Sequence, residues 1–449
     1  MPRATDVGDS TLTRDGRMPW YVTKSPEVGF RTPIRGPFLQ GVHPMPKQLS
    51  VTCFASIALA VGALAGCSDS AETSGAGTGE DLPIERGIAL DLVKPGETSP
   101  FTPLSASAAC VAGGKAEQLV LPTGYVQTLL ASEGAGFPDL ADMITVNETK
   151  SRRGRFLYRT HETGSNGAVS VTDLVTGATS ILAQRADWER LDGIAWTPWG
   201  TIIMAEEVTT STFKDPTQPS AVGGHVYEID PQTGASKVLP ATGARSHEGL
   251  RFDKAGNLYG ISETGPGYIY RFEPDHPNDL GSGQLYALKV TTDLGDRTGW
   301  ATWVELDDAA VLINSVAEAA AKGATGYTRP EDVEIGTSTG DDRRGNNILF
   351  AAITGEDRVL AIDLKPQGGS PGQVFVTNYV KDGVNAPADF DLPDNLALDR
   401  AGNLYITEDP GGNAAGGKTL GDDVWFAPFN AASARPVAPD PAIPVGYGL

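Results

Sequence analysis

Cysteine and positive charge are both scarce in this chain. Three cysteines occur among 449 residues, and 35 Lys and Arg face 56 Asp and Glu, for a formal net charge of −21. Three cysteines are too few for a framework of internal disulfides. The stability of the fold must therefore come from packing. An acidic chain offers no basic stripe for a phosphate backbone, so nucleic acid is not an expected partner.

A long apolar run occurs only near the N-terminus. From Met45 the chain reads "MPKQLSVTCFASIALAVGALAGCSDS", which resembles a bacterial lipoprotein signal ending at Cys67. We therefore expect a signal peptide at 45–66, a lipid on Cys67, a flexible tether at 67–80 and a mis-assigned upstream region at 1–44. The protein would then be extracytoplasmic and anchored to a membrane of the cell envelope. An ordinary secretory signal with a chance cysteine is the alternative.

The rest of the chain has little helical pattern. After Leu119, short runs of Val, Ile, Leu, Tyr and Phe alternate with Gly, Asn, Asp and Pro, which is typical of many antiparallel strands. The segment Ser315 to Ala324 is the exception, because its alanine-rich composition predicts a short helix. The fold class expected is all-β.

One sequence pattern repeats along the chain. It is clearest in "RLDGIAWTPWGTIIMAEEV" from Arg190, "SHEGLRFDKAGNLYGISET" from Ser246 and "LPDNLALDRAGNLYITEDP" from Leu392. Each copy has an acid, a strand, a turn with glycine, a second strand and another acid, and an outer hairpin follows. Repeated four-stranded units predict a β-propeller, here six-bladed, as a single domain over 81–449 with its motifs in 119–429.

The repeated acids predict a site. In a hairpin the start of the first strand and the end of the second lie at the same edge, so these acids should gather at one mouth of the propeller channel. Crowded carboxylates raise one another's pKa unless cations neutralise them, and oxygen ligands favour Ca²⁺, then Mn²⁺ or Fe³⁺. The alternative is that they cap turns or line a solvated rim. The acids counted are Glu162, Asp192, Glu206, Glu207, Glu248, Glu263, Glu331, Asp332, Asp394, Glu408 and Asp409.

These motifs resemble a known family. "LPTGYVQTLL" at Leu121, "THE" at Thr160, "TPWGT…EE" from Thr197, "SHEGLRFD" at Ser246 and "RPEDVE" at Arg329 occur in the order found in PhoX-type alkaline phosphatases. That family has a six-bladed propeller whose channel mouth holds Fe³⁺ and Ca²⁺ ions that hydrolyse phosphate monoesters. The resemblance implies Arg329 as a phosphate clamp, with a surface ion pair to Glu331 or Asp332 as the alternative. The catalytic residues expected are Arg329 and Glu331, and the metal ligands Glu162, Asp192, Glu206, Glu207, Glu248, Glu263, Glu331, Asp394 and Asp409.

Two positions depart from the family pattern. Asp192 stands where the family has an iron-binding cysteine, and Thr160 replaces an asparagine. A carboxylate is a harder ligand than a thiolate, so Asp192 favours Ca²⁺ or Mn²⁺ over iron.

The function expected is a lipid-anchored, metal-dependent phosphatase acting on a small phosphorylated substrate as a monomer. A non-catalytic, calcium-binding propeller that binds a ligand or protein at the cell envelope is the main alternative. A calcium-dependent lactonase or sugar-type hydrolase is the third.

Overall fold

The computed structural model describes residues 121, 129–131, 140–336, 348–366, 368–387, 390–399, 403–409 and 423–427. The predicted upstream region, signal peptide, lipidated Cys67 and tether all lie outside these residues. No helix among the described residues is both long and apolar enough to cross a membrane.

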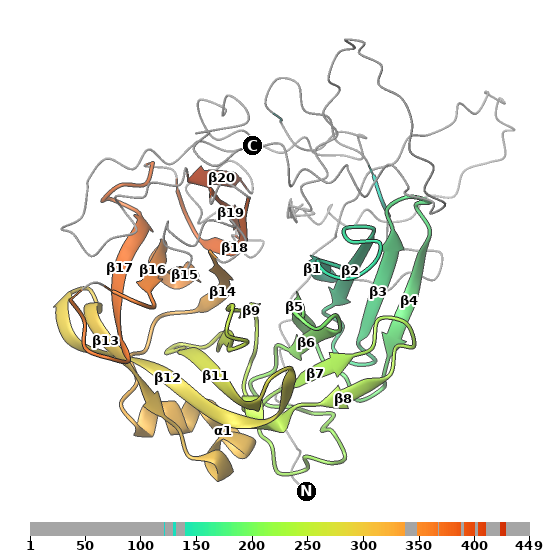
Figure 1. Ribbon diagram of the computed structural model, residues 1–449, viewed down its shortest axis with the longest axis horizontal. Coiled ribbons are helices and arrows are strands. Elements are labelled where there is room, and N and C mark those ends of the chain that lie inside the picture. Colours follow the sequence, from blue (N-terminus) through green and yellow to red (C-terminus); the bar gives the residue numbers. More distant parts are fainter. Residues whose placement is uncertain are drawn as a thin grey trace, which may run out of the picture.

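Antiparallel strands dominate the described chain and form groups in sequence order, each running from the centre outwards (Figure 1). The first group is β1 (Ala141–Val146), β2 (Phe156–His161), β3 (Ala168–Asp173) and β4 (Thr179–Gln184). The second is β5 (Leu191–Trp196), β6 (Ile202–Glu206), β7 (Val226–Ile229) and β8 (Ser236–Val238). The third is β9 (Leu250–Phe252), β10 (Leu258–Ile261), β11 (Ile269–His276) and β12 (Asp279–Gly295), extended by β13 (Thr298–Glu305).

The fourth and fifth groups continue this order. They are β14 (Pro330–Ile335), β15 (Ile348–Ile353), β16 (Arg358–Asp363) and β17 (Gln373–Lys381), then β18 (Pro393–Leu398), β19 (Leu404–Glu408) and β20 (Val424–Ala427). Because β13 pairs with both β12 and β17, the third and fourth groups join into one nine-stranded sheet. Two short 3₁₀ helices, η2 (Pro240–Thr242) and η3 (Thr354–Glu356), lie in connecting segments.

The groups are arranged around one centre, which the innermost strands β1, β5, β9, β14 and β18 face (Figure 1). Each innermost strand contacts the next one along the chain. This arrangement confirms the predicted all-β propeller. The described residues contain five such blades, and six blades remain a prediction.

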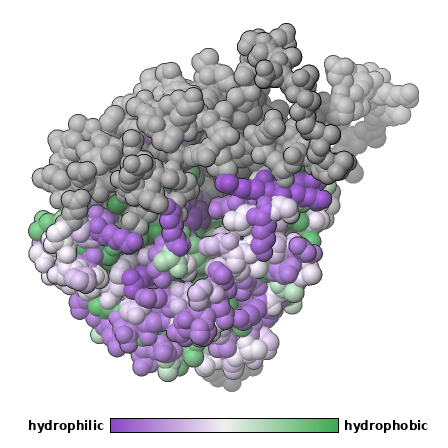
Figure 2. Space-filling view, in the orientation of Figure 1, coloured by the Kyte–Doolittle hydropathy of each residue, from purple (hydrophilic) through white to green (hydrophobic). Residues whose placement is uncertain are grey.

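The hydrophobic cores lie between neighbouring blades. Val169, Trp188, Ile194 and Met204, for example, form one core between the first and second blades, and three similar clusters follow round the ring. At such packing, each buried aliphatic side chain contributes about 1.5–3 kcal/mol. The outer surface in view is mostly hydrophilic, with hydrophobic residues in small groups (Figure 2).

The predicted insertion helix is present but longer than expected. Helix α1 (Asp308–Ala321) begins seven residues before the predicted start and ends three before the predicted end. Asp307 caps it, because its carboxylate accepts hydrogen bonds from the backbone of Ala309 and Ala310. Asp307 is thus a start signal that the alanine content alone did not reveal.

The close approach of innermost strands gives one prediction about stability. A Cβ atom added at Gly193 on β5 would lie 1.8 Å from the carbonyl oxygen of Glu248, so Gly193→Ala should force the second and third blades apart. We expect a loss of about 3 kcal/mol in the free energy of unfolding, measured by chemical denaturation. Gly164→Ala is the control, because nothing lies within 4 Å of its added Cβ. Equal effects of the two substitutions would contradict the prediction.

Candidate metal centre

One main-chain hydrogen bond recurs in all five described blades. A residue just after the second strand donates its N–H to the carbonyl of a residue just before the innermost strand. We call the donor position the second-acid position, because four of its five residues are acidic. The pairs are Glu162 to Leu140 (2.7 Å), Glu207 to Arg190 (2.8 Å), Glu263 to Ser246 (3.2 Å), Thr354 to Arg329 (3.0 Å) and Asp409 to Leu392 (3.1 Å).

An acid also lies two residues after each acceptor of this bond, at what we call the first-acid position. In four blades the pairing of the first two strands shifts register here, which marks a β-bulge. A bulge adds one residue to a strand and changes the direction of the side chains next to it. The bulges therefore turn these acids toward the channel mouth. The first acids are Asp142, Asp192, Glu248, Glu331 and Asp394.

Asp142 is the member of this series that the sequence analysis missed. The other complete copies separate the two acids by 15 residues, but Asp142 and Glu162 are 20 apart because the turn after β1 is longer. The signal available was an acid before the apolar run "MITV". Conversely, Thr354 occupies the second-acid position of the fourth blade, and its hydroxyl donates to the carbonyl of Pro393 at 2.5 Å.

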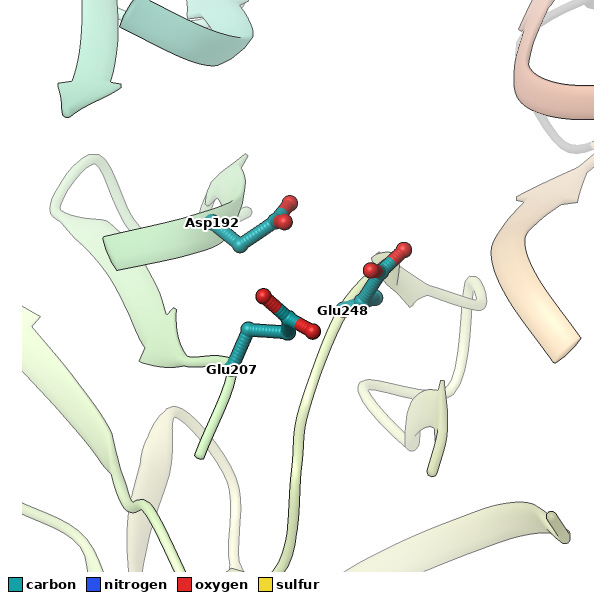
Figure 3. A group of neighbouring side chains, drawn as sticks. All are labelled: Asp192, Glu207 and Glu248. Atoms are coloured by element: carbon teal, nitrogen blue, oxygen red, sulfur yellow. The ribbon is translucent and has the colours of Figure 1, made fainter. Parts of the chain in front are cut away.

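Five of the predicted ligands form two overlapping groups in which potential ligand atoms lie within 4.8 Å of one another. Asp192, Glu207 and Glu248 form the first group, and their carboxylates converge (Figure 3). Glu248, Glu263 and Glu331 form the second. Glu248 belongs to both groups, so the two are continuous. All but Glu263 are buried, and the Glu263 side chain is only 9% exposed.

Three other predicted ligands surround these groups without joining them. Burial and Glu263 raise the pKa of Glu207, and Glu162 raises it further. Burial and Glu263 likewise raise the pKa of Glu331, to about 8, with Asp409 adding to the effect. Asp394, the third, accepts a hydrogen bond from the amide of Asn395 at 3.2 Å.

The structure places Glu206 apart from both groups. Its two carboxylate oxygens accept hydrogen bonds from the backbone N–H groups of Glu189 and His225, each at 3.1 Å, and burial raises its pKa to about 8. Glu408 has the same arrangement in the fifth blade, where it accepts from the backbone of Asp391 at 2.9 Å. Glu206 and Glu408 therefore hold loops together within their own blades. The next residue after Glu206, Glu207, belongs instead to the first group of converging carboxylates.

Arg329 lies at the edge of the second group. Its Nε is 2.7 Å from Glu263 Oε1 and 2.9 Å from Glu331 Oε1. The predicted ion pair with Glu331 is therefore present, but inside the site rather than on an open surface. Its two terminal nitrogens make no hydrogen bond within the described residues, so they are free to bind an anion.

A charge network that is only partly buried holds the backbone next to Arg329. Glu356 accepts a hydrogen bond from the Thr328 N–H at 2.6 Å and two from Arg297, at 2.9 and 2.7 Å. Arg358, which is fully buried, also pairs with Glu356. Arg329 itself has a φ of 53°, a left-handed conformation that is unfavourable for a side-chain-bearing residue. The network thus fixes a strained backbone in place.

Thr160 holds the backbone that carries Asp192, a member of the first group. Its buried hydroxyl lies 2.6 Å from the carbonyl oxygen of Asp192 and 3.1 Å from that of Met143, so it holds the bulge that carries Asp192. Thr160, which stands where the family has an asparagine, therefore hydrogen-bonds to main-chain carbonyls in this protein.

The donor set suits a cation. Burial raises the pKa of Glu248 well above its usual range, and Asp192, Glu331 and Glu263 raise it further. Converging carboxylate oxygens with one paired arginine leave negative charge that hard cations such as Ca²⁺ would neutralise. The geometry therefore fits a metal ion.

A family model for alkaline phosphatase PhoX matches residues 194–429, just over half of the 449 residues. The chain belongs to the PhoX family. The sequence resemblance is thereby confirmed, and membership supports a metal-dependent, phosphatase-type function.

Solved structures similar to this chain include PhoX from Pseudomonas fluorescens in complex with vanadate, a transition state analogue. It is 17% identical, with 75% of this chain and 88% of that chain covered and a TM-score of 0.54. A putative glucose dehydrogenase from Thermus thermophilus is 13% identical, with coverages of 67% and 87% and a TM-score of 0.41. A gluconolactonase from Xanthomonas campestris is 12% identical, with coverages of 78% and 88% and a TM-score of 0.41. A search of curated proteins finds no match.

The adjacent residues Glu206 and Glu207 should respond oppositely to the same substitution. Glu206→Gln places an amide against a backbone N–H, so we expect a loss of about 2 kcal/mol in stability but unchanged calcium binding. Glu207→Gln removes one of the converging carboxylates, so it should weaken calcium binding at least tenfold without destabilising the metal-free protein. Calcium calorimetry and denaturation in chelator measure the two effects. Similar behaviour of both variants would refute the assignment.

Calcium should stabilise this PhoX-family protein more strongly at high pH. The pKa of Glu331 is raised from 4.5 to about 8, so between these pH values the folded metal-free protein retains a proton that the unfolded chain has lost. Its free energy of unfolding therefore falls as pH rises. Bound calcium replaces the proton and adds about 4 kcal/mol at 1,000 times its Kd. Melting curves at pH 5 and pH 8 test this, and equal calcium shifts at both would contradict it.

Proposed function

We propose that this protein hydrolyses phosphate monoesters at a metal cluster held by the carboxylates described above. The observation that carries the proposal is the position of Glu248. It belongs to two groups that could each hold a cation, and Arg329 lies beside the second group with two terminal nitrogens that make no hydrogen bond to the part of the chain that the structure describes.

Asp192, Glu207, Glu248, Glu263 and Glu331 would hold the metal ions. The all-oxygen donor set, with Asp192 in place of a thiolate, favours Ca²⁺ or Mn²⁺ over Fe³⁺. When bound, such ions polarise phosphoryl oxygens and supply an activated water near neutral pH.

The chain's own residues bind and orient the substrate. The terminal nitrogens of Arg329 donate two parallel hydrogen bonds to the phosphate, because the guanidinium geometry matches two phosphate oxygens. Glu263 orients that guanidinium by accepting the hydrogen bond from its Nε, and Glu331 Oε1 lies 2.9 Å from the same nitrogen. Because the backbone of Arg329 is already fixed, its side chain needs little reorganisation when the phosphate binds, and less conformational entropy is lost.

We further propose that the protein acts outside the cytoplasm, attached to a membrane by a lipid on Cys67 and separated from it by the 67–80 tether. The signal-like sequence supports this location. A small phosphorylated substrate and metal ions are the partners expected for a monomer.

Two observations favour a second function, a non-catalytic calcium-binding propeller. Thr354 breaks the series of second acids beside Arg329, and Thr160 supports the backbone where the family has an asparagine. Elemental analysis separates the two functions, because several ions per chain support the enzyme and a single calcium ion supports the binding module.

The enzymatic proposal predicts that the protein supplemented with Ca²⁺ or Mn²⁺ hydrolyses p-nitrophenyl phosphate. Glu248→Gln should abolish turnover because it removes a carboxylate from both groups, and Glu331→Gln should do so because it removes the carboxylate of the second group that lies beside Arg329. Asp308→Asn, at the exposed start of α1, is the control and should retain full activity. The absence of turnover with any divalent or ferric supplement would rule out the enzyme.

A further inference from the structure

Arg190 occupies the same backbone setting as Arg329, two blades away. Their φ angles are 46° and 53°. Arg190 donates its N–H to the carbonyl of Thr163 at 2.8 Å, and Arg329 donates its own to Thr264 at 3.1 Å. The main-chain carbonyls of Arg190 and Arg329 themselves accept the recurrent hydrogen bond of their own blades. Because the dihedral angle and both hydrogen bonds match, the two side chains leave equivalent points of the propeller in equivalent directions.

The two arginines lie at opposite ends of the run of candidate ligands. Arg190 precedes Asp192 by two residues in the second blade, and Arg329 precedes Glu331 by two residues in the fourth. Glu248 of the third blade lies between Asp192 and Glu331 and shares a group with each. The backbone positions of Arg190 and Arg329 therefore flank the blade that carries Glu248, and either side chain extends from the mouth of the channel on which these carboxylates lie.

The surroundings of the two side chains differ. Arg329 is paired with Glu263 and Glu331 and only 30% exposed. The residue in the Glu263 position one blade before Arg190 is Glu162, which interacts with Glu207 instead. Arg190 is exposed, and within the described residues only its main-chain groups make hydrogen bonds. Its guanidinium is therefore available to an incoming anion.

We propose that Arg190 binds a second anionic group of the substrate, a carboxylate or a further phosphate, while Arg329 holds the phosphate that is removed. The preferred substrates would then be phosphate monoesters whose alcohol portion is itself anionic. The inference rests on the proposed function for the identity of the first group. It does not require turnover, because an anion can bind Arg190 without being hydrolysed.

Two matched substrate pairs of different length test this proposal. They are glycerol 3-phosphate with 3-phosphoglycerate and glucose 6-phosphate with 6-phosphogluconate, in which the second member carries an added carboxylate. The wild type should show a lower KM for the acid of at least one pair. Arg190→Gln should raise that KM about tenfold, the loss of one charge-assisted hydrogen bond, with unchanged kcat and unchanged KM for the partner that lacks the carboxylate. Arg190→Lys should retain part of the preference.

Lys254→Gln is the matched control, because it removes one exposed positive charge far from the site. Lys254 lies in the turn between β9 and β10, whereas Glu248 and Glu263 lie at the other ends of these two strands. It should leave every KM unchanged. Equal changes in Arg190→Gln for the acids and for the partners without a carboxylate, or no wild-type preference in either pair, would overturn the proposal.

A binding measurement separates this proposal from the proposed function. If no pair is hydrolysed, calorimetry with the calcium-loaded protein compares 3-phosphoglycerate and 6-phosphogluconate with glycerol 3-phosphate and glucose 6-phosphate, which lack the carboxylate. Tighter binding of an acid that Arg190→Gln abolishes supports the second anion site even without catalysis. Identical binding by wild type and Arg190→Gln overturns it.

Discussion

The repulsion among buried carboxylates at the centre of the ring is the constraint on which the rest of this structure depends. Glu207, Glu248 and Glu331 are all buried, and each has its pKa raised by burial first and by its neighbours second. Such a group would scatter if it were carried on flexible loops, since like charges in a low dielectric repel strongly. Arg329 offsets part of this charge, and hard cations are the natural complement for the remainder.

The propeller holds these groups together through its backbone rather than its side chains. The recurrent hydrogen bond closes each inner hairpin, the bulges aim the first acids, and Gly193 lets the second blade approach the backbone of Glu248. Glu206 and Glu408 strengthen the same hairpins from within the blade. A rigid scaffold of this kind explains how the chain can keep a costly cluster in place, and the same rigidity is what oriented binding of a phosphate requires.

Much of the site could be predicted because the repeat has a fixed spacing. An antiparallel hairpin returns to its origin, so acids 15 residues apart had to lie at one edge, and Asp192, Glu207, Glu248 and Glu263 do so. The distinction between Glu206 and Glu207 could not be predicted, because successive residues of a strand point to opposite sides and either register fits the sequence. Asp142 was missed because a longer turn broke the spacing.

By itself, the sequence determined the fold class, the repeat and the family, because short apolar runs, turn residues and motif order are local properties of a chain. Only the tertiary structure decided which carboxylates converge, that Glu248 is shared, and that Arg190 and Arg329 occupy equivalent settings in different blades. Those relations depend on bulges and on contacts between strands that are far apart in the sequence, and neither leaves a periodic mark in the residues themselves.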